Sequence, residues 1–375
     1  MYPKSLTLFL LLCSVWLNLG CEKVDQRRAR RIANEAVESI NAGQYTNAKT
    51  LLQQAVRLYA YDPHTHYLLG RAQQASEEWP EAIQSYLKCI SLEANNKSAH
   101  LNLAKIYVKN KEFQKAIPHY EKAFELNPKD ANYAYELALT YQSARQFPKA
   151  AEAMQKAIQL HPKYTEAYNG LASVHLDQAA AHEPPPPDPT PPPEDDDKKK
   201  KKKKKKGEPE PPRTILVPIA EAAKPFYSKA EAAILSAIQN QAANEQSYNL
   251  LALLFIKQHQ FEQAVNTTQK ILTTKPNDAG ALFHQGLAYD LWYEKSRIQA
   301  ITEKDKTQKA SLERDAAEKR EKALDTFKDF IQRKIGDEGM KMDVRMKIRN
   351  LTELKERELA KELEAKKKPR RKKRR

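Results

Sequence analysis

The sequence predicts an all-α solenoid of about six to seven helix pairs, and an internal repeat and the composition both support this. A pattern of small, aromatic and apolar residues recurs every 34 residues in the middle of the chain. A period of this size is typical of solenoids, in which each unit is one helix pair that buries its apolar face only against its neighbours. The 375 residues include only 9 Gly but abundant Ala, Leu, Lys, Glu and Gln, which favours helices over strands.

The repeat is clearest from Lys97 to Pro162, where two copies follow one another. The first copy has Leu103, Ala104, Tyr107, Phe113, Ala116, Tyr120, Ala123, Leu126 and Pro128, and the second has Leu137, Ala138, Tyr141, Phe147, Ala150, Met154, Ala157, Leu160 and Pro162. We expect Ala116 and Ala150 to mark the point where the second helix crosses the first. Only a small side chain lets the helices approach closely there, and a larger one would hold them apart. This pattern resembles the tetratricopeptide repeat (TPR) family, which implies stacked antiparallel helix pairs.

The period extends in both directions and divides the chain. We expect N-terminal repeats over residues 21–182 and C-terminal repeats over residues 214–335, separated by an insertion at 183–213. Leu171 and Ala172 open a helix pair whose second helix, at Tyr227 to Ala237, comes after an insertion of about 46 residues. A charged segment at 294–320 interrupts the last pair. Residues 336–365 are predicted to form a capping helix, and 366–375 a basic tail.

The N-terminus is typical of an exported lipoprotein. Lys4 precedes an apolar run from Leu6 to Leu17, and Gly20 and Cys21 follow it. A charged start, a run of this length and a small residue before the cut indicate a secretory signal over residues 1–20. The Gly20–Cys21 end resembles a bacterial lipobox, which implies that Cys21 is lipidated, and Glu22 after it favours the outer membrane. The alternative is an ordinary signal peptide with a chance cysteine.

The net charge of +16 is concentrated in two runs. Lys198–Lys206 and Lys366–Arg375 each carry nine positive charges, so the rest of the chain, at 16 minus 18, has a net charge of −2. The repeats are therefore not a basic surface, and we expect no nucleic acid as partner. One hypothesis is that the two runs contact anionic envelope polymers such as lipopolysaccharide or peptidoglycan. The other is that the first run is a solvated spacer.

The two insertions differ in composition. Residues 183–213 contain proline runs, an acidic block and nine lysines, and should form an extended, disordered loop because nothing apolar is present to bury. Residues 294–320 lack Pro and Gly, which favours an antiparallel helical hairpin with a thin apolar seam. We expect that seam to contain Leu291, Ile298, Ile301 and Leu312. A frayed, partly helical loop is the alternative.

The sequence contains little that could perform chemistry. It has no glycine-rich phosphate loop, no CxxC pair and no HExxH, and its nine histidines are scattered. His66, His100 and His175 fall on packing positions of the repeat, where we expect half-buried rings with hydrogen-bond partners and not ligands or bases. Cys89 takes a place where other copies have Ala, so we expect it to be a small buried hydrophobe. We predict no enzymatic activity, no cofactor and no metal site.

The TPR resemblance also implies a binding groove. In that family the first helix of each pair lines a concave groove, at the second, fifth, ninth, twelfth and thirteenth positions of the repeat. In this sequence the matching residues are Tyr67, Arg71, Leu101, Lys105, Val108, Lys109, Tyr135, Leu139, Asn169, Ser173, Asn249, Leu253 and Ile256. Aromatic and apolar anchors between a few cations suit a peptide or helix of another protein. Leu253 and Ile256 could instead be covered by the next unit.

These features together predict a lipid-anchored TPR scaffold on the periplasmic side of the outer membrane. It would be anchored to the membrane through the lipid on Cys21 and would recruit or position other envelope proteins. Examples are the motility, pilus or secretion machinery, because the architecture is similar to lipoproteins of type IV pili and of gliding motility. Alternatives are a regulatory adaptor of cell-wall enzymes, an assembly factor for outer-membrane barrels and, from a different class, a nucleic-acid-associated scaffold that uses the basic runs.

Overall fold

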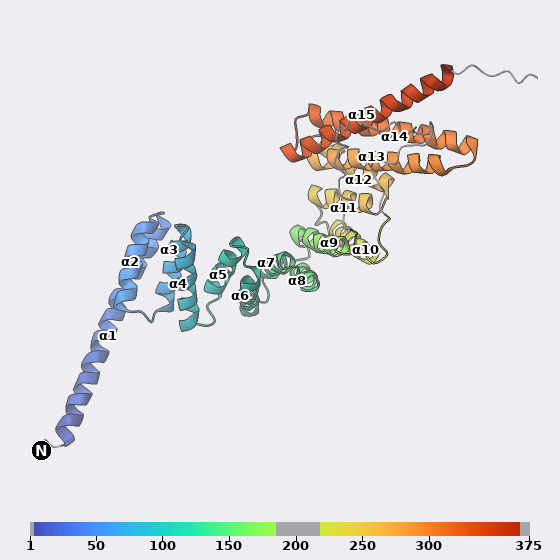
Figure 1. Ribbon diagram of the computed structural model, residues 1–375. Helices are drawn as coiled ribbons and strands as arrows, with labels where there is room; N and C mark the ends of the chain where they lie inside the picture. Colours follow the sequence, from blue (N-terminus) through green and yellow to red (C-terminus); the bar gives the residue numbers. More distant parts are fainter. Residues whose placement is uncertain (1–3, 185–217, 368–375) are drawn as a thin grey trace, which may run out of the picture. The chain divides into compact units, whose positions relative to one another are not determined.

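The structure is a computed structural model that describes residues 4–184 and 218–367, with side chains from residue 23 to residue 360 within those ranges (Figure 1). Every element in these ranges is an α-helix, as predicted. The helices are α1 (Lys4–Asn41), α2 (Tyr45–Leu58), α3 (Pro63–Ala75), α4 (Trp79–Leu92), α5 (Lys97–Lys109), α6 (Phe113–Leu126), α7 (Ala131–Ser143), α8 (Phe147–Leu160), α9 (Thr165–Ala180), α10 (Lys224–Gln239), α11 (Glu245–Lys257), α12 (Phe261–Thr274), α13 (Ala279–Thr302), α14 (Lys306–Gln332) and α15 (Glu338–Lys367).

The chain divides into two compact units, one up to His161 and the other from Pro162. In the first unit, α1 pairs with α2, α3 with α4, α5 with α6, and α7 with α8. In the second, the pairs are α9 with α10, α11 with α12, and α13 with α14, and α15 packs on α14. The all-α fold of stacked helix pairs is therefore confirmed.

Local sequence signals set the helix ends. Asp62, Asn96, Asp130, Asn244 and Asp278 cap the first helix of their pairs, because each side chain accepts a hydrogen bond from a backbone N–H of the first turn.

The turn inside each pair of the first unit has a left-handed residue. Gly43, Glu77, Lys111 and Arg145 stand 34 residues apart, with φ of 73°, 60°, 60° and 58°. Only the first of them is the glycine that this backbone favours. The turn geometry thus follows the same period as the packing.

The core of each pair is built on small residues. Ala82, Ala116 and Ala150 are fully buried at the start of α4, α6 and α8, and Ala48 holds the same place in α2. Tyr86, Tyr120 and Met154 follow one turn later and are also fully buried. Because the alanines allow close approach, the larger side chains can fill the space toward neighbouring helices.

The two helices that flank the first insertion pack as one pair. The Tyr227 hydroxyl of α10 donates a hydrogen bond to the Glu183 carboxylate, just after α9. The same carboxylate lies 3.6 Å from the ammonium of Lys257 in α11. Glu183 is thus tied to the repeats by these contacts, and the insertion boundary at residue 183 stays a prediction. The run Lys198–Lys206 lies outside the described residues.

The charged segment at 294–320 forms a helical hairpin, because α13 and α14 run past the length of an ordinary repeat and pair along it. The predicted apolar seam is wrong in part, since Ile301 is 43% exposed while Tyr293, Ala300 and Ala316 are buried. Gly286 allows the closest contact, because a Cβ there would lie 2.4 Å from the buried ring of Phe327.

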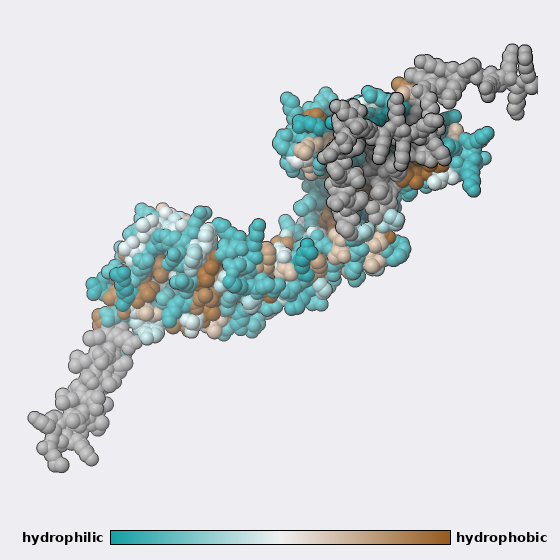
Figure 2. Space-filling view, viewed as in Figure 1, coloured by the Kyte–Doolittle hydropathy of each residue, from teal (hydrophilic) through white to brown (hydrophobic). Residues whose placement is uncertain are grey.

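The last described helix, α15, contributes Val344 and Leu351 to the core of the second unit. Leu359 is 55% exposed, so the apolar face of this helix is buried along only part of its length. Of the predicted basic tail 366–375, residues 368–375 lie outside the described part. Figure 2 shows that most visible residues are hydrophilic and that hydrophobic ones form small separate patches.

Helix α1 crosses the predicted cleavage site between Gly20 and Cys21 without a break. Within the described ranges, no helix combines the length and the apolar character needed to span a membrane.

The first prediction concerns helix packing. Ala116→Trp should lower the free energy of unfolding by about 1–3 kcal/mol or more, because the helices cannot separate without loss of their contacts. Lys115→Trp, at a neighbour whose side chain is 65% exposed, should change it by less than about 0.5 kcal/mol. Thermal denaturation followed by circular dichroism would measure both, and equal shifts would contradict the assigned repeat phase.

The second prediction concerns the insertion. Deleting residues 185–212 should change the free energy of unfolding by less than about 1 kcal/mol, since loop-closure entropy depends only weakly on length. Deleting residues 183–212 removes Glu183 as well and should cost about 1 kcal/mol more, through the lost hydrogen bond from Tyr227. Denaturant titration of the two variants compares them directly. A loss of cooperative unfolding in the shorter deletion would show that the insertion supports the repeats.

Candidate functional site

The first helices of the first unit present a mixed apolar and basic face. Tyr67 of α3, Leu101 and Val108 of α5, and Tyr135 and Leu139 of α7 are all half-buried. Tyr67, Leu101 and Tyr135 occupy equivalent repeat positions, 34 residues apart, so they recur on the same side of successive helix pairs. Half-buried aromatic and aliphatic side chains of this kind offer apolar area to a partner at little cost in conformational freedom.

The three cations predicted for this face are exposed but differ in their surroundings. Arg71 of α3 and Lys105 of α5 point into solvent. The ammonium of Lys109 lies 3.6 Å from the centroid of the Trp79 ring, a close cation–π contact. Arg71 and Lys105 are therefore the cations available to an acidic group of a partner, whereas Lys109 is partly engaged by the protein itself.

Buried tyrosines of the second helices hold this face in place. The Tyr86 hydroxyl donates to the Gln74 side-chain oxygen at 2.7 Å and is also hydrogen-bonded to Asn102 of α5. Tyr120 makes the equivalent bond to Glu136 of α7. Burial is the main cause that raises the pKa of both phenols, so they stay neutral donors. Each tyrosine thereby fixes the first helix of the next repeat.

The predicted groove positions of the second unit are less uniform. Leu253 is half-buried, but Ile256 is only 4% exposed, so it is a core residue and not a surface anchor. Ser173 is half-buried. The Asn249 amide nitrogen donates to the Asp278 carboxylate at 3.0 Å, which ties α11 to the capped start of α13.

Asn169 of α9 is unusual because it is buried without hydrogen bonds. The residue is only 7% exposed, and neither its amide nitrogen nor its amide oxygen has a hydrogen-bond partner among the described residues. The Asn249 amide oxygen is likewise unpaired. A buried amide without partners costs about 1–3 kcal/mol, so such groups need an explanation.

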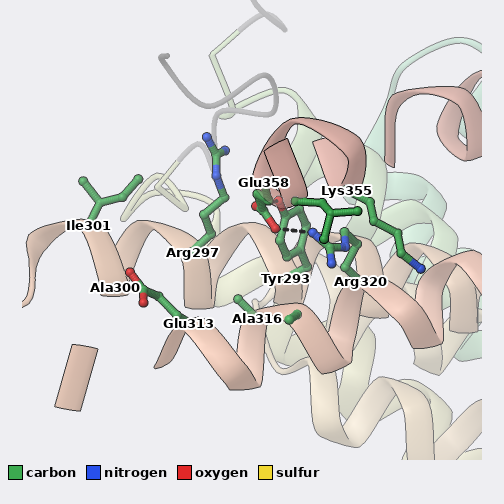
Figure 3. Close-up of a pocket in the computed structure, with 11 residues that line it drawn as sticks. Tyr293, Arg297, Ala300, Ile301, Glu313, Ala316, Arg320, Lys355 and Glu358 are labelled. Atoms are coloured by element: carbon green, nitrogen blue, oxygen red, sulfur yellow. Dashed lines mark hydrogen bonds and ion pairs between the residues drawn. The ribbon is translucent and has the colours of Figure 1, made fainter. Parts of the chain in front are cut away.

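A cavity of about 450 Å³ lies between α13, α14 and α15 (Figure 3). Tyr293, Ala300 and Ala316 form its buried lining. Arg320 of α14 pairs there with Glu358 of α15, and Lys355 pairs with Glu321 at 2.7 Å. The Arg297 guanidinium is held by Glu294 at 3.1 Å. The cations of this cavity are therefore already neutralised by acidic neighbours.

Sequence reasoning missed this cavity. Three of its five charged residues, Arg297, Glu313 and Arg320, lie in a segment charged throughout, where nothing in the composition separates buried from solvated positions. The one usable signal was Tyr293, an aromatic residue at the edge of that segment, and it proves to be almost fully buried.

The three histidines predicted to be half-buried are more deeply buried than that, at 7% exposure each, and two of them have backbone partners. The His66 and His100 Nε2 atoms lie 2.9 and 3.1 Å from the carbonyl oxygens of Ala60 and Ala94. The His100 and His119 Nδ1 atoms are 3.0 Å apart. His175 is also buried, with its Nδ1 2.7 Å from the Gln178 side-chain oxygen.

Cys89 is fully buried, which raises the pKa of its thiol to about 12 and makes it unreactive. In the part of the chain that the structure describes, no cluster of three or more His, Cys, Asp or Glu could hold a metal ion.

Comparison with known families gives a direct match in the first unit and at the start of the second. Three profiles described as tetratricopeptide repeat match residues 65–98, 98–130 and 135–181. These ranges contain the clearest copies of the sequence period. No curated protein matches the sequence.

Among solved structures, MamA from Desulfovibrio magneticus RS-1 is 26% identical, over 40% of this chain and 84% of that one, with a TM-score of 0.38. A tetratricopeptide repeat protein from Parabacteroides merdae is 16% identical, over 86% of this chain and 99% of that one, with a TM-score of 0.46.

The histidines generate a prediction about pH. Burial lowers the pKa of His119 and His284 to about 4, with a further contribution from His100 for the former. In the unfolded chain such groups titrate near 6.5. Between about pH 6.5 and 4 the unfolded state therefore binds more protons, and the free energy of unfolding falls as the pH falls.

Melting temperatures at pH 7 and pH 5 would check this. The wild-type protein should melt lower at pH 5, and a variant with His119→Gln and His284→Gln should show a smaller decrease. Replacing the exposed His64 by Gln should leave the decrease unchanged. An equal decrease in all three proteins would contradict the assignment.

Proposed function

Because this chain is a tetratricopeptide-repeat protein, we propose that it is a lipid-anchored scaffold on the periplasmic side of the outer membrane that recruits or positions other proteins of the cell envelope. Its repeats form a fold that binds other proteins. The anchor and the location are the finer part of the proposal. Their support is the apolar run followed by Gly20 and Cys21 at the N-terminus.

The observation that carries the binding role is the face of α3, α5 and α7. It repeats an apolar or aromatic side chain at Tyr67, Leu101 and Tyr135, with exposed Arg71 and Lys105 beside them. A partner segment with apolar side chains and a few acidic ones would match this face, because its apolar side chains would contact the apolar positions and its acidic ones the cations.

Two variants on this face and one control variant on α4 test the proposed binding surface. Leu101→Asp or Lys105→Glu should reduce recovery of partner proteins from detergent-solubilised envelopes, with affinity reduced roughly tenfold or more for an anchor residue. Leu87→Asp, at an exposed leucine of α4, serves as the control. Circular dichroism would confirm that each variant is folded. Equal recovery with Leu101→Asp and Leu87→Asp would count against this face.

The anchor has its own test. Cys21→Ser should leave an uncleaved precursor or a soluble form, because the acyl chains on that cysteine provide the attachment. Membrane fractionation and incorporation of labelled fatty acid would measure this. Unchanged fractionation together with no labelling of the wild-type protein would refute the lipoprotein assignment.

A further inference from the structure

Helix α1 has an exposed basic face close to the proposed lipidation site. Five cations follow Cys21 within ten residues, and all five are exposed: Lys23, Arg27, Arg28, Arg30 and Arg31. Arg27, Arg30 and Arg31 lie on one side of the helix, because their spacing is that of successive turns. The opposite side carries the buried residues Ala29, Ile32, Ala33 and Ala36, which pack against the first repeat.

No described acidic side chain pairs with these cations. None of the five cations forms an ion pair with another described residue, although ion pairs occur elsewhere in both units. Asp25 is half-buried on the packed side of the helix, and Glu22 lies outside the residues whose side chains the structure describes. The next acidic residues on the exposed side, Glu35 and Glu38, lie farther from Cys21 than the five cations do. Residues 21–31 thus carry five cations and two acidic residues, a net charge of +3, whereas the rest of the chain outside the two basic runs, at −2 minus 3, has a net charge of −5.

Position and chemistry both favour phosphate as the partner of this face. At a rise of 1.5 Å per residue, Arg31 lies about 15 Å along the helix from Cys21. An acyl chain on Cys21 would therefore bring all five cations within reach of the headgroup layer. Arginine binds phosphate oxygens with two parallel hydrogen bonds, and juxtamembrane basic segments are attracted to anionic lipids. The five cations form a convex strip on one helix, which suits a surface better than a folded acidic protein.

We propose that this basic face of α1 lies against the headgroups of anionic phospholipids. The inference rests on the proposed lipid anchor at Cys21, because that anchor brings the face to the membrane. The acyl chains hold one point of the protein, and the arginines fix the orientation of the first repeat about that point. The packed side of α1, and with it the first repeat, then faces away from the lipid.

A fluorophore at Asn34 tests this orientation. Asn34 is exposed and stands on the same side as Arg27, Arg30 and Arg31, and Cys89 is too buried to compete for the label. The lipidated full-length protein with Asn34→Cys would be reconstituted into vesicles doped with a nitroxide-labelled lipid. Quenching should be stronger in vesicles containing phosphatidylglycerol than in vesicles of phosphatidylcholine alone. The excess should be lost in 1 M salt, where the Debye length is about 3 Å.

Three variants make the test specific. Replacing Arg27, Arg28, Arg30 and Arg31 by Gln should abolish the excess quenching. Replacing the exposed cations Lys304, Lys306, Arg314 and Lys328 of the second unit by Gln gives the same change in net charge and should preserve it. Replacing Lys198–Lys206 by Gln should also preserve it. Loss of the excess in this last variant would overturn the proposal and assign the lipid contact to the lysine run.

The lipid anchor at Cys21 and the lipid contact of the basic face are separate claims, and different results would refute each. Protein that is recovered with the vesicles but shows equal quenching with both lipid compositions would refute the basic face as a lipid contact and leave the anchor intact. Protein that is not recovered with either kind of vesicle would refute the lipid anchor, and the inference would fall with it.

Discussion

The close approach of two helices at a buried alanine is the constraint on which the other features of the repeats depend. Ala48, Ala82, Ala116, Ala150, Ala230 and Ala264 occupy this position in successive pairs, and all are fully buried. A fixed approach also fixes the rotation of each helix about its axis, and hence which residues face the neighbours and which face solvent. The half-buried Tyr67, Leu101 and Tyr135 are a consequence of that rotation.

Most of this arrangement could be predicted from the sequence, because the 34-residue period specifies packing and exposure together. The TPR resemblance implies that Leu101 and Lys105 lie on the groove face, and in the structure Leu101 is half-buried and Lys105 is exposed. Ile256 is instead a core residue, which agrees with the alternative that the next unit covers it. It lies in α11, which contacts both α12 and the long helix α13, so the ordinary repeat environment does not apply there.

The burial of charged residues in the α13–α14 hairpin and the contacts of Glu183 could not be predicted, because these contacts do not recur with the 34-residue period. The α13–α14 hairpin buries Arg320 and Glu294 in a segment that is charged throughout, and only the fold distinguishes them from solvated neighbours such as Glu313. The role of Glu183 was missed for a related reason. It joins the repeats through one hydrogen bond to Tyr227, which is distant in sequence and specified by no local pattern.

The tyrosine hydroxyls that cross from one repeat to the next have a consequence for how the first unit comes apart. Tyr86 is hydrogen-bonded to Asn102, Tyr120 to Glu136, and Tyr141 to Glu121. These bonds join α4 to α5, and α6 to α7, across the boundaries between repeats. In a linear array, stability is the sum of terms for single repeats and for neighbouring pairs. Strong neighbour terms make partly opened arrays rare, so these repeats should open together and not fray singly from one end.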